Sequence, residues 1–141
     1  MKSPYPYTRL SPSLEDYLKT ILQGGPAITV SVIAARLNVS KASAVEAVHK
    51  LCALGLTTHR RYGPVSLTPR GLTVARNIVA RHRAFTAWLT TALGVPRPLA
   101  ERDACVLEHG LSPETTTRLL HYAAGLARFT SPARPGPEKH D

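Results

Sequence analysis

A helix-turn-helix pattern decides the fold of this chain, and it lies in residues 28–51, which read ITVSVIAARLNVSKASAVEAVHKL. A short apolar helix comes first, and turn-forming residues follow at 38–40. A second amphipathic helix then continues until Gly55, because glycine is a favoured helix stop. Two helices joined by such a short turn are typical of DNA-binding helix-turn-helix proteins. They are also compatible with an αα-hairpin in a helical bundle, so the neighbouring segments decide between the two.

The second helix of this pair has the features of a recognition helix. It begins with the small polar residues Ser40, Lys41 and Ser43, which suit close approach to the major groove. The N-terminal part of a recognition helix reaches base edges and phosphates there. Glu46 is unusual in this position, because a carboxylate repels phosphate but can accept a hydrogen bond from N4 of cytosine. Either Glu46 reads a base or it faces away from the DNA, and the sequence favours neither.

The segment after the second helix predicts a β-hairpin, the wing of a winged helix. Two short β-prone runs in residues 56–68 flank a Gly-Pro turn. Arg60, Arg61 and Tyr62 lie at its tip, where they could bind phosphate or enter the minor groove. A formal net charge of +9 on 141 residues favours a polyanionic partner such as double-stranded DNA. Hairpin and charge together favour DNA binding, and a solvated turn is the alternative for the three tip residues.

The remaining segments predict helices, so the chain is expected to be mainly α-helical with one small β-hairpin. A capping residue followed by proline begins helices at residues 11, 68 and 112. The helix after residue 68 carries an apolar stripe to about Leu93, which predicts a core or a dimer interface. Four segments are predicted in chain order: a flexible arm at 1–10, a winged helix-turn-helix domain at 11–70, a second helical domain at 71–128 and a disordered tail at 129–141.

The composition argues against several other classes of protein. There is no apolar run of about 18 residues and no apolar leader, so we expect neither a membrane span nor export. The two cysteines, Cys52 and Cys105, do not make a disulfide framework, and we expect them to be reduced in the cytoplasm. An apolar fraction of 43% is enough for a hydrophobic core. The sequence therefore predicts a globular cytoplasmic protein.

A cluster of possible metal ligands lies in residues 103–112, which read DACVLEHGLS. On a helix, Cys105, Glu108 and His109 share one face, because each residue turns by about 100°. Gly110 would place them in the last turn, at the negative end of the helix dipole, which favours a cation. A thiolate, a carboxylate and an imidazole are ligands for a transition metal. The alternative is an ordinary helix with a buried cysteine and a solvated Glu-His pair.

The ordered motifs of the chain resemble a known family, the iron- and manganese-dependent repressors of the diphtheria toxin repressor and manganese transport regulator type. The resemblance covers about residues 13–120. Besides the helix-turn-helix, it rests on SLEDYL at 13–18, GPVSLTPRG at 63–71, RHR at 81–83 and DACVLEHGLS at 103–112. It implies a homodimer that binds a palindromic operator when a divalent metal acts as co-repressor, with metal binding and dimerisation assigned to 71–128. The function it implies is repression of metal-homeostasis genes rather than enzyme activity.

The resemblance also implies a set of metal ligands. Carried over residue by residue, the primary site is Asp16, Cys105, Glu108 and His109. The set is a hybrid, because the iron branch of the family has methionine at the position of Asp16 and the manganese branch has glutamate at that of Cys105. Fe(II) is therefore the first expectation and Mn(II) the second, and the donors also suit Zn(II), Co(II) and Ni(II).

The family's second, ancillary metal site is expected to be degenerate in this chain. His82 stands at one of its positions, and Glu101 stands at a plausible one. Thr86 replaces an acidic ligand of the iron branch, and Lys19 stands where the manganese branch has a glutamate. A lysine ammonium repels a second cation, so we expect one regulatory metal per subunit. Taken alone, His82 lies on an apolar stripe and is more often a hydrogen-bonded core residue.

Two other functions are compatible with the same residues. A metal-independent winged-helix regulator could keep this scaffold, since the ligand set is a hybrid and Lys19 lies beside it. A metallohydrolase is the more remote alternative, because Cys-x-x-Glu-His is similar to the zinc-peptidase pattern His-x-x-Glu-His. The leading cysteine and the winged helix-turn-helix argue against catalysis.

Overall fold

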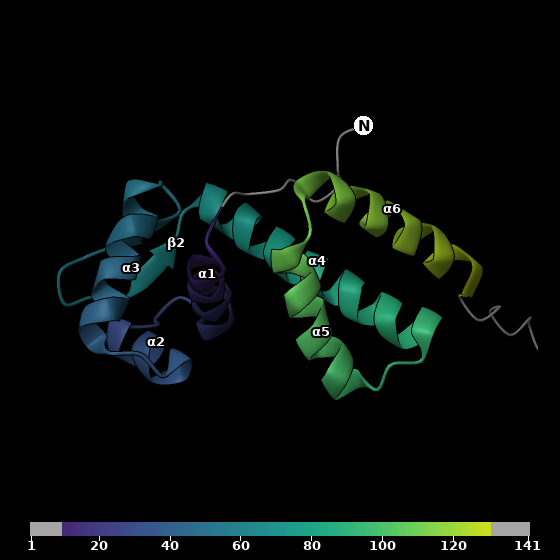
Figure 1. Ribbon diagram of the computed structural model, residues 1–141. Coiled ribbons are helices and arrows are strands. Elements are labelled where there is room, and N and C mark those ends of the chain that lie inside the picture. Colours follow the sequence, from purple (N-terminus) through teal and green to yellow (C-terminus); the bar gives the residue numbers. More distant parts are fainter. Residues whose placement is uncertain (1–9, 131–141) are drawn as a thin grey trace, which may run out of the picture. The chain divides into compact units, whose positions relative to one another are not determined.

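The computed structural model describes residues 10–130, except for the side chains of residues 126–130. The predicted arm and tail therefore lie almost entirely outside the described residues. Within that range the chain is mainly helical with one antiparallel hairpin, which confirms the predicted fold class (Figure 1). The elements in chain order are α1 (Pro12–Gly24), α2 (Val30–Leu37), α3 (Lys41–Ala53), β1 (Thr57–His59), β2 (Val65–Leu67), α4 (Pro69–Leu93), α5 (Arg97–Gly110) and α6 (Pro113–Thr130). None of the described helices is both long and apolar enough to cross a membrane.

The chain divides into two compact units, Met1–Arg83 and Ala84–Asp141. The first contains α1 to α3, the hairpin and the first part of α4, and the second contains the rest of α4 with α5 and α6. Ala75 and Ile78 of α4 are buried in the core of the first unit, so the first turns of this helix pack with α1 to α3.

Side chains at the helix ends define the helix-turn-helix. The hydroxyls of Ser11, Thr29 and Ser40 each accept a hydrogen bond from the backbone N–H three residues on, at 3.2, 3.3 and 3.1 Å. These are the N-caps of α1, α2 and α3. Asn38 ends α2 with a left-handed φ of 54°, which asparagine tolerates better than most residues. The turn between α2 and α3 is therefore encoded by the residues that form it.

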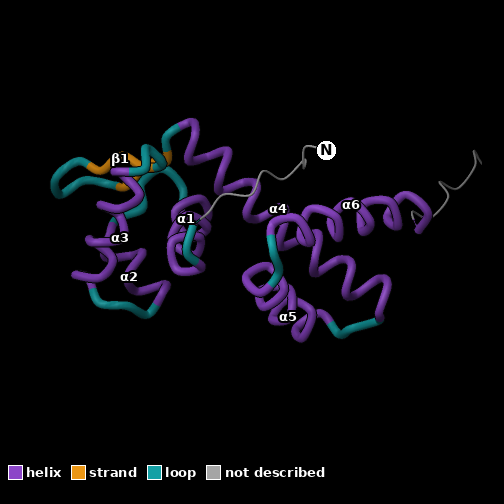
Figure 2. The backbone as a smooth tube through the Cα atoms, turned by 45° about the horizontal axis from the view of Figure 1, so that its top comes forward, coloured by secondary structure: helices purple, strands orange, loops and turns teal. Residues whose placement is uncertain are grey.

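The core of the first unit is apolar and includes residues from the helices and the hairpin. Its fully buried side chains include Leu18, Ile33, Val48, Leu51, Leu56 and Val65. The two strands pair in the register Thr57↔Leu67 to His59↔Val65. The backbone N–H of Val65 also donates to the carbonyl of Ile28 at 2.8 Å, so the hairpin is attached to the segment before α2. Figure 2 shows the strands of the hairpin in orange.

The tip of the hairpin is a tight turn over residues 60–63, and the predicted Gly-Pro pair marks its end. The N–H of Gly63 donates to the carbonyl of Arg60 at 2.9 Å. Tyr62 has a φ of 61°, a left-handed conformation that costs a non-glycine residue on the order of 1 kcal/mol. The tip residues predicted from the sequence are therefore at the tip, and the backbone there holds an aromatic side chain outward.

The second unit packs the later part of α4 with α5 and α6 around a small apolar core. Its buried residues include Phe85, Leu89, Ala100, Ala104 and Leu120. Ala100 and Ala104 lie one turn apart on α5, so a strip of small side chains allows close packing of that helix. Phe85 and Leu89 belong to the apolar stripe predicted for α4, and both are core residues here.

Gly71, in the first turn of α4, lies against the segment between α3 and β1. A Cβ at position 71 would collide with the carbonyl group of Leu56, which is backbone. The same carbonyl accepts a hydrogen bond from the N–H of Thr68 at 3.1 Å. The hydroxyl of Thr68 donates to the carbonyl of Gly55 at 2.6 Å. These contacts fix the start of α4, and only glycine at position 71 leaves room for the Leu56 carbonyl.

We expect Gly71→Ala to lower the free energy of unfolding by about 2 kcal/mol or more, because a methyl group there overpacks against backbone that cannot rotate away. Urea denaturation measures the change. Gly125→Ala is the matched control, since a Cβ at position 125 meets nothing within 4 Å and alanine favours a helix. Equal unfolding midpoints for Gly71→Ala and the parent would contradict the close approach.

Candidate nucleic-acid interface and metal centre

The surface of α3 divides cleanly into a buried and an exposed side. Ala44, Ala47, Val48 and Leu51 are buried, whereas Glu46 and the residues near it are exposed. The exposed side also contains Lys41, Ala42, Ser43, His49, Lys50 and Ala53. The second helix of the motif therefore presents a largely polar face to solvent, as a recognition helix requires.

The two serines predicted to approach DNA form hydrogen bonds with each other at the start of α3. The hydroxyl of Ser40 donates to the hydroxyl of Ser43 at 2.8 Å and accepts from the Ser43 N–H at 3.1 Å. Both side chains are exposed, so their oxygens can still accept further hydrogen bonds. Lys41, which lies between them in the sequence, is exposed and adds a positive charge to the start of α3.

A groove of about 600 Å³ separates α3 from the hairpin. Lys41 and His49 line it from α3, and His59, Arg61 and Tyr62 line it from the hairpin. The two histidines were missed by the sequence analysis, because a histidine on a helix and one on a strand show no common spacing. Two cations and two imidazoles thus line one groove, and the cations suit a phosphate backbone.

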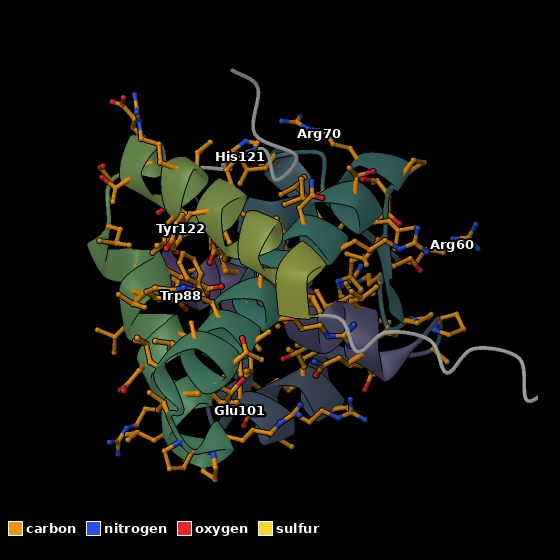
Figure 3. The ribbon with its side chains drawn as sticks, turned by 90° about the vertical axis from the view of Figure 1, so that its right-hand side faces the viewer. Arg60, Arg70, Trp88, Glu101, His121 and Tyr122 are labelled. Carbon is orange, nitrogen blue, oxygen red and sulfur yellow. The ribbon has the colours of Figure 1, made fainter. Side chains whose placement is uncertain are left out.

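The hairpin tip projects positive charge. Arg60 and Arg61 are exposed, and the side chain of Tyr62 is 94% exposed. The guanidinium carbon of Arg61 lies 5.5 Å from the centroid of the Tyr62 ring, which is a cation–π contact. Figure 3 shows Arg60 extending away from the ribbon. The three predicted tip residues are thus accessible to a partner.

The three predicted donors of the second unit lie on α5, near its C-terminal end. Glu108 is buried, Cys105 is half-buried and His109 is exposed. Among residues 10–130, no group of three or more His, Cys, Asp or Glu side chains is gathered closely enough to hold a metal ion. The donor chemistry nevertheless fits a transition metal, because a thiol, a carboxylate and an imidazole stand at i, i+3 and i+4 of one helix.

Asp16 lies on α1, in the first unit, and is paired with a lysine of the same helix. Its Oδ1 is 3.4 Å from Nζ of Lys19, and the two side chains are 50% and 23% exposed. Tyr17, the next residue, is buried, and this burial raises the pKa of its phenol. The carboxylate of Asp16 is therefore the accessible acidic group of this turn of α1, and Lys19 supplies a cation beside it.

The residues predicted for an ancillary site lie in different units. His82 is half-buried on α4 in the first unit, and Glu101 is exposed on α5 in the second. Oε1 of Glu101 accepts a hydrogen bond from Nε of Arg97 at 3.2 Å, one turn earlier on the same helix (Figure 3 labels Glu101). Thr86, at the position of an acidic ligand, is buried. Glu101 thus already has a positively charged partner of its own.

A buried ion pair between α1 and α4 was not foreseen from the sequence. Nη2 of Arg81 donates to Oε1 and Oε2 of Glu15 at 2.9 and 3.0 Å, and both side chains are 5% exposed. Glu15 directly precedes Asp16, and Arg81 directly precedes His82. The pair therefore fixes the two helix segments that carry these candidate ligands.

The two parts of the chain match two models of one protein family. Residues 9–65 match the iron dependent repressor, N-terminal DNA binding domain. Residues 68–128 match the iron dependent repressor, metal binding and dimerisation domain. The first range contains α3 and the hairpin up to Val65, and the second contains the donors of α5.

Individual relatives agree with these matches. The chain is 32% identical over 114 residues to an uncharacterised HTH-type transcriptional regulator of Methanocaldococcus jannaschii, with 78% of this chain and 91% of that protein covered. It is 33% identical over 113 residues to the transcriptional regulator MntR of Salmonella typhimurium, with 77% and 71% covered. A solved manganese-dependent transcriptional repressor in complex with manganese has 30% identity and a TM-score of 0.66. The match covers 79% of this chain and 52% of the solved repressor, so this chain spans about half the length of that repressor.

We expect Glu15→Ala to lower the free energy of unfolding by about 3–5 kcal/mol, because it leaves a buried guanidinium without its carboxylate. Urea denaturation again measures the change. The matched control is Glu114→Ala, whose pair with Arg118 is 77% and 79% exposed and is worth less than about 1 kcal/mol.

The double variant Glu15→Leu/Arg81→Met should recover most of that loss, because neither charge remains buried without a partner. If Glu15→Ala lowers the free energy of unfolding no more than the Glu114→Ala control does, the result would contradict a buried ion pair.

Proposed function

Because this chain belongs to the iron-dependent repressor family of metal-dependent transcriptional regulators, we propose that it binds a palindromic operator as a homodimer when Asp16, Cys105, Glu108 and His109 hold a divalent metal. The observation that carries the proposal is the donor triplet on α5, which lies within the segment matched by the family's metal binding and dimerisation domain. The relatives are transcriptional regulators, which are not enzymes, so the metallohydrolase alternative has no support.

The choice of metal follows from the chemistry of the donors. A thiolate favours softer ions over Mn(II), whereas carboxylates suit harder ions, and an imidazole binds most first-row metals. We infer Fe(II) as the first choice and Mn(II) as the second, with Zn(II), Co(II) and Ni(II) as ions that the same donors accept. The reduced thiol of Cys105 that this requires is the state expected of a cytoplasmic regulator.

The proposed ligands also connect metal binding to DNA binding. Asp16 belongs to the unit that carries the recognition helix, and the other three ligands belong to the unit matched by the dimerisation domain. Shared coordination would select one arrangement of the two units, and only an arrangement that spaces the two recognition helices correctly binds the operator. Dimerisation is supported by exposed apolar residues on one face of α5, Leu99 and Val106.

The number of metal ions follows from Lys19. Its ammonium lies 3.4 Å from the carboxylate of Asp16, and the Lys19 side chain is only 23% exposed. A cation held at this position repels a second metal ion and provides positive charge beside the acidic ligand. We therefore infer one regulatory metal per subunit.

We expect Asp16→Asn and His109→Ala each to abolish the stimulation of DNA binding by metal, because each removes one ligand. Both side chains are exposed, so neither substitution should disturb folding. Fluorescence anisotropy with a duplex selected from a random library, titrated with anaerobic Fe(II) and separately with Mn(II), measures the response. Glu114→Ala is the control, since it removes an exposed carboxylate that is not a proposed ligand. A full metal response in both ligand variants would show that the site is misplaced.

We expect saturated parent protein to hold one metal ion per subunit, as measured by elemental analysis after equilibrium dialysis. Lys19→Glu should bind a second ion, because it replaces a repelling ammonium with a carboxylate. Lys19→Met is the control that removes the charge without adding a ligand. Two ions per subunit in the parent would refute the single-metal proposal, and an unchanged stoichiometry in Lys19→Glu would remove Lys19 from it.

A further inference from the structure

The centre of the exposed side of α3 can be located from the residues that are buried. Each residue of a helix turns by about 100°, so the line opposite Ala44, Ala47, Val48 and Leu51 contains residues 42, 46, 49 and 53. These are Ala42, Glu46, His49 and Ala53, and all four are exposed. Glu46 therefore does not face away from a partner that approaches α3 from solvent.

The charges on α3 are ordered across this exposed side. Its central line carries one carboxylate, one imidazole and two methyl groups, and no lysine or arginine. Lys41 and Lys50 lie on its two edges, and Nζ of Lys50 is 3.4 Å from Oε1 of Glu46. The cations of α3 therefore lie at the edges of its exposed side, and the centre is left to a carboxylate and an imidazole.

Separate hollows flank α3 on its two edges. One lies toward the hairpin and is lined by Lys41, His49 and Arg61 among others. The other lies toward the start of α1 and is lined by Ser43, Glu46 and Lys50 among others. In the major groove the two phosphate strands run along the edges and the base edges form the floor. A helix with a lysine beside each flanking hollow matches that geometry, and its central line then lies over the bases.

We propose that Glu46 and His49 read a C·G base pair in each half-site, with the Glu46 carboxylate accepting from N4 of cytosine and the His49 imidazole donating to N7 or O6 of guanine. The proposal rests on the DNA-binding function of the family. An ionised carboxylate can only accept hydrogen bonds, and the major-groove donors are N4 of cytosine and N6 of adenine. Adenine presents its N7 acceptor beside N6, which repels the carboxylate, whereas cytosine has no second acceptor there.

His49 supports the same base pair from the next turn. It lies three residues after Glu46, a spacing that places two side chains side by side on a helix. An imidazole N–H is a donor, and guanine offers two acceptors, O6 and N7, in the pair that contains the cytosine donor. The acid and the imidazole are thus complementary to the two halves of one base pair.

Selection from a random-sequence duplex library in the presence of Mn(II) tests the proposal with the full-length chain. The parent should select a C·G pair at one position of each half-site, preferred over other pairs by about 5- to 100-fold. Glu46→Gln should shift that position toward A·T, because glutamine pairs with N6 and N7 of adenine. His49→Ala should reduce the preference for guanine. Glu114→Gln is the control, because Glu114 on α6 is exposed and pairs with Arg118 four residues on, as Glu46 pairs with Lys50. It should leave the selected sequence unchanged.

A second control separates base reading from charge. Arg60→Ala removes an exposed cation of the hairpin tip, so it should weaken binding to all sequences alike and reduce the salt dependence. If Glu46→Gln selects the parent sequence, or only raises affinity for every sequence equally, Glu46 does not read a base and the proposal is wrong. If the parent protein selects no sequence with any metal, the proposed sequence-specific regulation is wrong. That outcome differs from a Glu46→Gln variant that keeps the parent's preference, which contradicts base reading by Glu46 alone.

Discussion

The ion pair between Glu15 and Arg81 is the interaction on which the arrangement of the first unit depends most. It places two opposite charges at 5% exposure, where neither could remain without the other. It joins α1, which bears Asp16, to the part of α4 that bears His82. A buried pair of this kind contributes less to net stability than it does to a defined geometry, because desolvation offsets much of the attraction. It fixes α1 and α4 in one register, with the exposed carboxylate of Asp16 on the residue next to the pair.

Much of the fold could be predicted because its signals are local. The helix starts at residues 12, 69 and 113 follow from a capping hydroxyl and a proline, and the turn of the helix-turn-helix follows from Asn38 and Ser40. The ion pair could not be predicted, because its two members are 66 residues apart and neither breaks a periodic pattern. The sequence also could not show that the first turns of α4 pack in the first unit, since they have the same apolar pattern whichever unit they pack against.

The candidate sites could likewise be predicted only as far as local sequence spacing reaches. Spacing alone placed Cys105, Glu108 and His109 on one helix, and the structure confirms that helix. Spacing could not show that Glu108 is buried while His109 is exposed, because that depends on which side of α5 packs in the second unit. For the recognition helix, the sequence left two orientations for Glu46, and the burial of its neighbours on α3 places it on the exposed side. Burial depends on how the helices pack against one another, so the sequence alone could not show which of these side chains are accessible to a partner.

The proposed ligand set, Asp16 with the three donors of α5, implies that metal binding and DNA binding are coupled. Thermodynamic linkage requires that DNA raise the affinity for metal by the same factor by which metal raises the affinity for DNA. The most direct measurement is the affinity of the homodimer for Mn(II), with Fe(II) measured anaerobically, in the presence and absence of the selected duplex. The account predicts tighter metal binding with the duplex, by the factor that metal adds to duplex affinity. An affinity for metal that does not change when the duplex is added would contradict it.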